Sequence, residues 1–174
     1  MHSTGLGQTI WIIVLVASFR LSAHDSLYNY IEVRPAGPES VEIEFTVHAA
    51  ELVPGVDPNS TDLLWIENLT DAEVETLLSR ARDFVADSYL CSLPIGCDIT
   101  FPDCAEIRQL ALEADAPRPG CIVAHVTVSR HQHPIALRYS EEAQKRLMLV
   151  VTTPGAFPQV HDLAPGEKFD ISPQ

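Results

Sequence analysis

The histidines are the residues whose type and spacing could support metal chemistry in this chain. His24 follows a predicted leader cleavage point after Ala23, so the exported chain would begin with a free amino group beside an imidazole. His48 has the strand parity of His24, and the expected hairpin register places it opposite Ser26 or Tyr28. One amino group and two imidazoles would give three nitrogen ligands, which suits copper. The alternative is a frayed amino terminus beside a surface histidine.

A second pair of histidines, His131 and His133, flanks Gln132. Residues two apart on a strand point to the same face, as zinc and copper sites often require. Pro134 follows directly and favours a connecting turn, in which neighbouring histidines are ordinarily solvated. His131 and His133 are therefore a second candidate ligand pair, with two solvated loop residues as the alternative.

Two further polar segments invite a catalytic and a calcium interpretation. His161 and Asp162 could mimic the imidazole and carboxylate of a hydrolase, but no GxSxG motif accompanies them. Residues 57–62 carry oxygen side chains at alternate positions, as calcium loops do. An EF-hand loop needs Gly at its sixth position and Glu at its twelfth, where this chain has Asp62 and Asn68. Ordinary loop polarity is therefore the favoured interpretation of residues 57–62.

Four cysteines, Cys91, Cys97, Cys104 and Cys121, lie in the middle of the chain. An even number in an exported protein predicts two disulfides, although four cysteines allow three connectivities. The favoured pairing joins Cys91 to Cys97 across a short turn and Cys104 to Cys121. The competing interpretation is a zinc site, but the CxxC spacing that is typical of zinc sites is missing.

An apolar run at residues 10–23 predicts a secretory signal peptide. The run is interrupted at Arg20, so it is shorter than the roughly 20 residues that cross a bilayer. The region ahead of it, residues 1–9, contains no Lys or Arg, which leaves an uncleaved membrane anchor as the alternative. The prediction is a signal peptide at residues 1–23 and one secreted domain at residues 24–174, periplasmic or extracellular.

The charge of the chain narrows the classes of partner. Its formal net charge is −13 at pH 7, which argues against nucleic acid because phosphates require a basic surface. The same charge argues against binding to an anionic membrane surface, so the leader, if uncleaved, is the only predicted membrane contact. The expected partner is therefore a protein or a metal ion.

Alternating apolar residues predict a mainly β fold with one inserted α-helix. The clearest strands form a hairpin in which Ile31 and Val33 share a buried face with Ile43 and Phe45. A capping box begins the helix expected near residues 70–87. We expect an antiparallel β-sandwich, immunoglobulin-like in general architecture. The expected strands are residues 28–34, 41–48, 105–112, 122–129, 135–139, 147–153 and 168–171.

The order of features over residues 23–87 resembles the extracytoplasmic amino-terminal region of HupE/UreJ-type bacterial membrane proteins. The resemblance rests on a leader ending Ala-His, a hairpin running into VHAAEL, an aspartate-rich loop and a helix TDAEVETLL, with weaker likeness as far as Phe157. In that family a membrane module linked with nickel or cobalt handling follows the soluble domain. The loop here lacks the family's glycine-containing aspartate repeat and the chain ends at Gln174, so the resemblance implies a similar exported domain without a transport role.

These observations favour an exported, non-enzymatic accessory or binding domain with an unidentified partner. The alternative is an extracytoplasmic domain that binds or delivers copper, nickel or zinc through His24 and His48, or through His131 and His133. A hydrolase or a copper oxidase is the third class, for which the sequence offers no motif.

Overall fold

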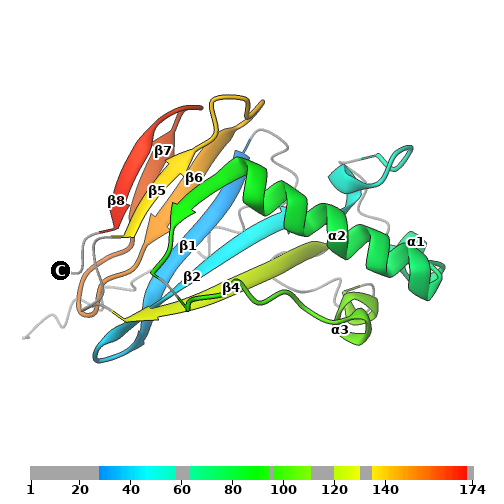
Figure 1. Ribbon diagram of the computed structural model, residues 1–174, viewed down its shortest axis with the longest axis horizontal. Helices are drawn as coiled ribbons and strands as arrows, with labels where there is room; N and C mark the ends of the chain where they lie inside the picture. Colours follow the sequence, from blue (N-terminus) through cyan, green and yellow to red (C-terminus); the bar gives the residue numbers. More distant parts are fainter. Residues whose placement is uncertain (1–27, 58–62, 95, 111–119, 130–134, 172–174) are drawn as a thin grey trace, which may run out of the picture.

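The computed structural model describes residues 28–57, 63–94, 96–110, 120–129 and 135–171, and Figure 1 draws their arrangement. Five strands form the larger sheet in the order β4-β2-β1-β6-β7. Their bounds are β1 Tyr28–Gly37, β2 Ser40–His48, β4 Cys121–Ser129, β6 Arg146–Val151 and β7 Gln159–Leu163. The smaller sheet has the order β3-β5-β8, with β3 Tyr89–Ser92, β5 Ile135–Tyr139 and β8 Lys168–Ile171. The helices are η1 Ala49–Leu52, α1 Leu64–Glu67, α2 Asp71–Ser88 and α3 Cys104–Gln109.

The hairpin of β1 and β2 confirms the register that the sequence predicts. Ile31 lies opposite Phe45 and Val33 lies opposite Ile43, and all four side chains are buried. Because side chains alternate along a strand, the polar residues between them fall on the other face of the sheet. This hairpin forms the centre of the larger sheet.

The larger sheet is mixed, so the prediction of an antiparallel architecture is wrong for this sheet. β1 pairs antiparallel with β2 but parallel with β6, with Ile31 beside Leu149. Alternation identifies a strand and its buried face, but it carries no information about which distant strand will lie beside it. The mainly β class is confirmed, as are the strands predicted at residues 135–139 and 168–171.

Helix α2 confirms the predicted helix and its cap. The Thr70 hydroxyl accepts a hydrogen bond from the Glu73 amide, and the Glu73 carboxylate accepts one from the Thr70 amide at 2.7 Å. These reciprocal bonds satisfy two amides that a helix start leaves unpaired. The buried stripe of α2 consists of Val74, Leu77, Leu78, Ala81 and Val85. In Figure 1 this helix crosses one face of β1, β2 and β4.

The strand predicted at residues 105–112 is wrong, because the chain forms helix α3 there. The Asp103 carboxylate accepts hydrogen bonds from the amides of Ala105 and Glu106, at 2.8 and 2.9 Å. The Glu106 side chain in turn accepts a bond from the Asp103 amide, which completes a second capping box. This local pattern outweighs the weak alternation of apolar residues, in which only Ile107 is buried.

One hydrophobic core joins the two sheets and α2. Buried side chains of β5 and β8, such as Leu137 and Ile171, belong to the same cluster as Leu147 and Leu149 of β6. Figure 1 draws the smaller sheet in front of β6 and β7, with α2 beside it in front of β1, β2 and β4. In the described part of the chain, no helix is long and apolar enough to cross a membrane.

Candidate binding surface

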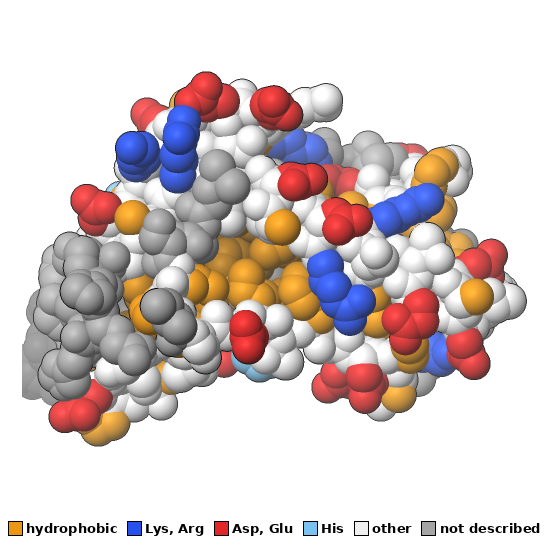
Figure 2. Space-filling view, viewed as in Figure 1, with side chains coloured by type: hydrophobic (Ala, Val, Ile, Leu, Met, Phe, Trp, Pro, Cys, Tyr) orange, Lys and Arg blue, Asp and Glu red, His pale blue; other side chains and the backbone are white. Residues whose placement is uncertain are grey.

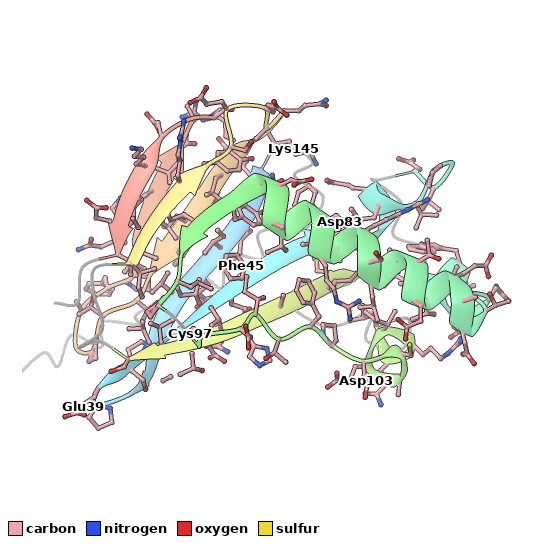
Figure 3. The ribbon with its side chains drawn as sticks, viewed as in Figure 1. Glu39, Phe45, Asp83, Cys97, Asp103 and Lys145 are labelled. Carbon is pink, nitrogen blue, oxygen red and sulfur yellow. The ribbon has the colours of Figure 1, made fainter. Side chains whose placement is uncertain are left out.

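A shallow apolar hollow opens on the face that α2 and the smaller sheet share. It is bordered by α2, by β3 and by the β3–α3 segment, residues 93–103 without residue 95, which lies outside the described residues (Figures 1 and 2). Figure 2 shows hydrophobic side chains gathered in this hollow, and Figure 3 places Phe45 of β2 behind it and Cys97 at its lower end. We call this region the apolar hollow.

Two of the elements that border the apolar hollow carry partly exposed apolar side chains. Phe84 comes from α2, and Leu93, Cys97, Ile99 and Phe101 come from the β3–α3 segment; all are only partly buried and pack against the core. Large apolar side chains that gather on a surface without full burial are typical of interaction sites. In the β3–α3 segment the sequence singles out only Cys97, as a disulfide partner, although the apolar residues there alternate with Pro94, Gly96, Asp98 and Thr100.

Aromatic rings connect the hollow to the interior. Tyr89 lies at the centre of this group, with its ring centroid 5.6 Å from that of Phe45, 6.0 Å from that of Phe84 and 6.0 Å from that of Tyr139. Phe84 meets Tyr89 edge to face, an arrangement that aromatic pairs favour. The floor of the hollow is therefore a packed aromatic cluster.

Polar groups lie behind this aromatic cluster, where β1, β5 and the β5–β6 connection meet. The Tyr139 hydroxyl accepts a hydrogen bond from Asn29 Nδ2 at 2.7 Å and donates one to the Lys145 carbonyl at 2.9 Å. The Lys145 ammonium forms an ion pair with Glu51, and Figure 3 labels Lys145 beyond the end of α2. These contacts join three distant parts of the chain.

Neither tyrosine of this region is suited to acid–base catalysis near neutral pH. Burial raises the pKa of Tyr89 well above its ordinary value, and the nearby Tyr139 and Glu51 raise it further. Burial likewise raises the pKa of Tyr139, although the hydrogen bond from Asn29 lowers it. Both phenols therefore stay protonated and act as structural groups.

The rim of the apolar hollow is mostly acidic. Asp83 and Asp87 are exposed one turn apart on α2, and Asp98 is exposed beside Cys97. Figure 3 labels Asp83 on the face of α2 turned toward the viewer. Arg82 also lies on this rim, with its guanidinium 5.6 Å from the centre of the Phe101 ring, a cation–π contact. A ligand of this surface would meet apolar side chains in the middle and carboxylates at the edge.

The structure describes only one of the four predicted histidine ligands. His24, His131 and His133 lie outside the described residues, and so do residues 58–62 of the loop considered for calcium. His48 lies at the end of β2, partly buried and directly opposite Cys121 of β4. Within the described ranges, no three His, Cys, Asp or Glu side chains converge as a metal site would require.

The remaining histidines occupy structural positions. His125 is exposed, and its backbone amide and carbonyl pair with Thr100 of the β3–α3 segment. His161 packs against Phe169 of β8, with the ring centroids 4.5 Å apart. Its neighbour Asp162 accepts a hydrogen bond from Arg146 Nε at 2.6 Å, and adjacent residues of a strand point to opposite faces. His161 and Asp162 therefore do not form the imidazole–carboxylate pair considered from the sequence.

The predicted disulfides are not formed in the structure. Cys97 and Cys104 are free thiols, whereas the predicted pairing needs Cys97 bonded to Cys91 and Cys104 bonded to Cys121. The Cys104 thiol instead donates a hydrogen bond to Glu75 Oε1 at 3.1 Å, and this bond is the main cause that raises the pKa of the thiol. The pairing stays a prediction for the exported, oxidised protein.

Comparisons with protein-family models, with curated proteins and with solved structures find no match to this chain.

Proposed function

We propose that this chain is an exported, non-enzymatic binding domain and that the apolar hollow accepts a segment of a partner protein. The observation that carries this proposal is the apolar hollow itself, together with the partly exposed apolar side chains of the elements that border it, above all Phe84, Ile99 and Phe101. An exposed apolar group with a polar rim is the usual anatomy of a protein interaction site. The leader at residues 1–23 and the resemblance to the extracytoplasmic region of HupE/UreJ-type proteins support export.

The charge of the rim points to a basic partner segment. Asp83, Asp87 and Asp98 are exposed on elements that border the hollow, and the whole chain carries a formal net charge of −13. Complementary charge speeds association and excludes like-charged competitors. A peptide segment with apolar residues at its centre and Lys or Arg at its ends fits this surface, whereas a second copy of the acidic chain would meet repulsion.

The sandwich predicted from the sequence stays part of the proposal. The smaller sheet shares one core with β6 and β7, and the contact of His161 with Phe169 joins β7 to β8. We propose an incomplete β-sandwich in which α2 occupies the part of the second layer that strands would fill. The hollow is then the gap between β3 and α2 in that layer.

The experiment that tests binding at the hollow uses short random peptides displayed on phage and selected against the exported protein. Peptides that bind the wild-type protein are measured again against Phe101→Ser and against Phe157→Ser. Phe157 is the matched control because it is 91% exposed and lies in the β6–β7 turn, outside the hollow. We expect basic, apolar peptides whose affinity falls about tenfold or more with Phe101→Ser and is unchanged with Phe157→Ser. If the selected peptides bind Phe101→Ser as tightly as they bind Phe157→Ser, the proposal is wrong.

A metal-binding function is the second candidate, and one relationship favours it. His48 and Cys121 are directly paired across β2 and β4, and alternation puts both side chains on the sheet face opposite to Val47 and Ile122. Cross-strand partners have Cβ atoms about 4.5–5.5 Å apart, close enough for one ion to bridge them. An imidazole and a thiolate suit zinc or copper(I), and His24 at the exported terminus would supply further nitrogen ligands. This function needs Cys121 in its reduced form and is therefore an alternative to the predicted disulfide between Cys104 and Cys121.

Titration with zinc and with copper(I) tests this second function. We expect one-to-one binding that is lost in His48→Ala and in Cys121→Ser and retained in His125→Ala, whose imidazole lies on the same strand as Cys121. A further variant, His24→Ala behind a leader that still cleaves, tests the amino-terminal ligand. Equal binding by the wild-type protein and all three single-site variants of His48, Cys121 and His125 would reject the site.

A further inference from the structure

We propose that the apolar hollow takes its partner as an extended strand that pairs with the edge of β3. This inference rests on the proposed binding function of the hollow and names the form of the bound segment. β3 pairs with β5 on one side only, at the end of the strand order β3-β5-β8. Figure 1 places its other edge toward the hollow, between β3 and the β3–α3 segment. Among the described strands, none pairs with this edge.

The hydrogen bonds of β5 show which residues of β3 face β5. The Tyr139 amide donates to the Glu167 carbonyl at 2.9 Å, and the Tyr139 carbonyl accepts from the Gly166 amide at 3.1 Å. Both backbone groups of Tyr139 are thus turned away from β3. The next residue, Ser140, donates its amide to the Ser88 carbonyl at 3.0 Å. Backbone groups of an antiparallel ladder alternate between the two sides, so every second residue from Ser88 onward faces β5.

The same alternation turns the backbone of Tyr89 and Cys91 toward the hollow, while Leu90 and Ser92 face β5. The Tyr89 amide donates to the Val85 carbonyl at the end of α2. Among the described residues, three backbone groups of this edge have no backbone partner and are placed to receive a partner strand: the Tyr89 carbonyl, the Cys91 amide and the Cys91 carbonyl. Strand addition of this kind gains affinity from backbone hydrogen bonds and specificity from alternate side chains.

The surroundings of β3 favour a strand over a helix at this edge. Natural proteins protect an open edge with Lys, Pro, a bulge or an inward charge, and β3 has the sequence YLCS, with none of these residues. An added strand would lie in the layer of β3 and β5, in front of Phe45 and next to the β3–α3 segment. Its alternate side chains would enter the apolar hollow, and the others would face solvent near Asp83 and Asp98. The expected ligand is therefore an extended peptide with alternate apolar and basic residues.

Amide hydrogen exchange measured by NMR tests the pairing with β3. The probe is the tightest peptide selected by the phage experiment, added at saturation to the full exported chain. We expect exchange of the Cys91 amide to slow, because that amide donates to the bound strand. The amides of Leu90 and Ser92, which already face β5, should change less. Unchanged exchange at Cys91 with bound peptide would overturn strand pairing.

Methylation of single backbone amides of the same peptide gives an independent test. In strand addition only alternate amides face β3, so methylation at alternate positions should weaken binding about fivefold to tenfold, with little effect between them. A helix in the hollow would lose affinity at every central position.

The experiments distinguish failure of strand pairing from failure of the proposed binding function. In the first case, peptide binding depends on Phe101 without slowing exchange of the Cys91 amide and without an alternating effect of methylation. That result keeps the hollow as the binding site and rejects pairing with β3. If no peptide depends on Phe101, the proposed function fails as well.

Discussion

Thr100 and His125 exchange two backbone hydrogen bonds, with the Thr100 amide 2.8 Å from the His125 carbonyl and the His125 amide 2.9 Å from the Thr100 carbonyl. This pair is the only contact of strand type between the β3–α3 segment and β4 in the described residues. It fixes the backbone at Thr100, between Ile99 and Phe101, two of the partly exposed apolar residues of this segment. The position of the proposed binding surface thus depends on a backbone contact rather than on side-chain chemistry.

Thr100→Pro should weaken both stability and peptide binding. Proline has no amide hydrogen, so one of the two bonds is lost, at a cost of about 1 kcal/mol, and the restricted backbone opposes the other. Thr100→Ala keeps both backbone bonds and is the matched control, because the Thr100 side chain is exposed. Urea unfolding and peptide affinity measure the two effects. Equal results for the two variants would contradict the assigned role of this contact.

Tyr139→Phe should destabilise the fold by about 1–3 kcal/mol in urea unfolding. The change leaves Asn29 Nδ2 without its acceptor and the Lys145 carbonyl without its donor, in a region where Tyr139 itself is fully buried. Tyr89→Phe is the control, since the Tyr89 hydroxyl is buried and has no hydrogen-bond partner among the described residues. Removal of that hydroxyl should leave stability unchanged or raise it. A larger loss in Tyr89→Phe would contradict this account.

Local patterns predicted the elements of this fold better than their arrangement. The register of Ile31 with Phe45 and the cap at Thr70 follow from alternation and from a motif four residues long, and the structure confirms both. The parallel pairing of β1 with β6 joins residues more than a hundred positions apart, and no local pattern encodes it. Helix α3 was predictable in principle, because Asp103 and Glu106 have the spacing of a capping box.

The candidate surface was hidden from the sequence for a physical reason. Leu93, Ile99 and Phe101 fall at alternate positions, as strand residues do, but Pro94, Gly96 and Pro102 between and after them are typical of turns and disguise the pattern. They meet only because the β3–α3 segment turns back along β4 and is fixed at Thr100. Histidines stand out in the sequence by residue type alone, whereas this surface is formed by tertiary packing. Of the residues of this surface, Phe84 alone lies in an element that the sequence predicted correctly, the helix near residues 70–87.

Gly120→Ala should be among the most destabilising single-methyl additions in the described chain. Gly120 has a φ of +69°, and an added Cβ would lie 2.6 Å from Leu63 Cδ2, too close for contact without movement. Gly155 is the control, with a φ of +77° and no atom within 4 Å of an added Cβ. Gly155→Ala should cost about 1–2 kcal/mol from backbone conformation alone, and Gly120→Ala should cost more. Equal thermal midpoints would contradict the packing argument.

Thr70→Ala should cost about 1 kcal/mol at neutral pH, because it removes the side-chain half of the cap of α2. It should also change the response to acid. Hydrogen bonds from the Thr70 amide and hydroxyl lower the pKa of Glu73, so the folded state binds this proton less readily than the unfolded state. The resulting stabilisation is present above the ordinary pKa of a glutamate and is lost as the pH falls through the lowered value.

Urea unfolding of the wild-type protein and of Thr70→Ala at several acidic pH values measures this effect. Stability of the wild-type protein should fall more steeply with acid than stability of the variant. Thr76→Ala is the matched control, because the Thr76 hydroxyl lies on the same helix and donates to the Ala72 carbonyl rather than to Glu73. Because the variant Thr70→Ala keeps the backbone amide, which is the larger cause of the lowered pKa, parallel pH profiles for the wild-type protein and Thr70→Ala would show that the Thr70 hydroxyl does not couple to protonation of Glu73.

Export should be accompanied by cleavage after Ala23 and by oxidation of the cysteines. The intact mass of the exported protein is expected to correspond to a chain that begins at His24, lowered by two hydrogen atoms for each disulfide.

A bond between Cys91 and Cys97 would tie the end of β3 to the β3–α3 segment and so fix two borders of the apolar hollow. Disulfides stabilise mainly by restricting the unfolded chain, typically by about 2–4 kcal/mol. Reduction should therefore lower the unfolding midpoint and weaken peptide binding together, and Cys97→Ser should reproduce both effects. Four alkylatable thiols in the unreduced, denatured protein would reject the predicted disulfides and leave Cys97 as the thiol that the structure describes.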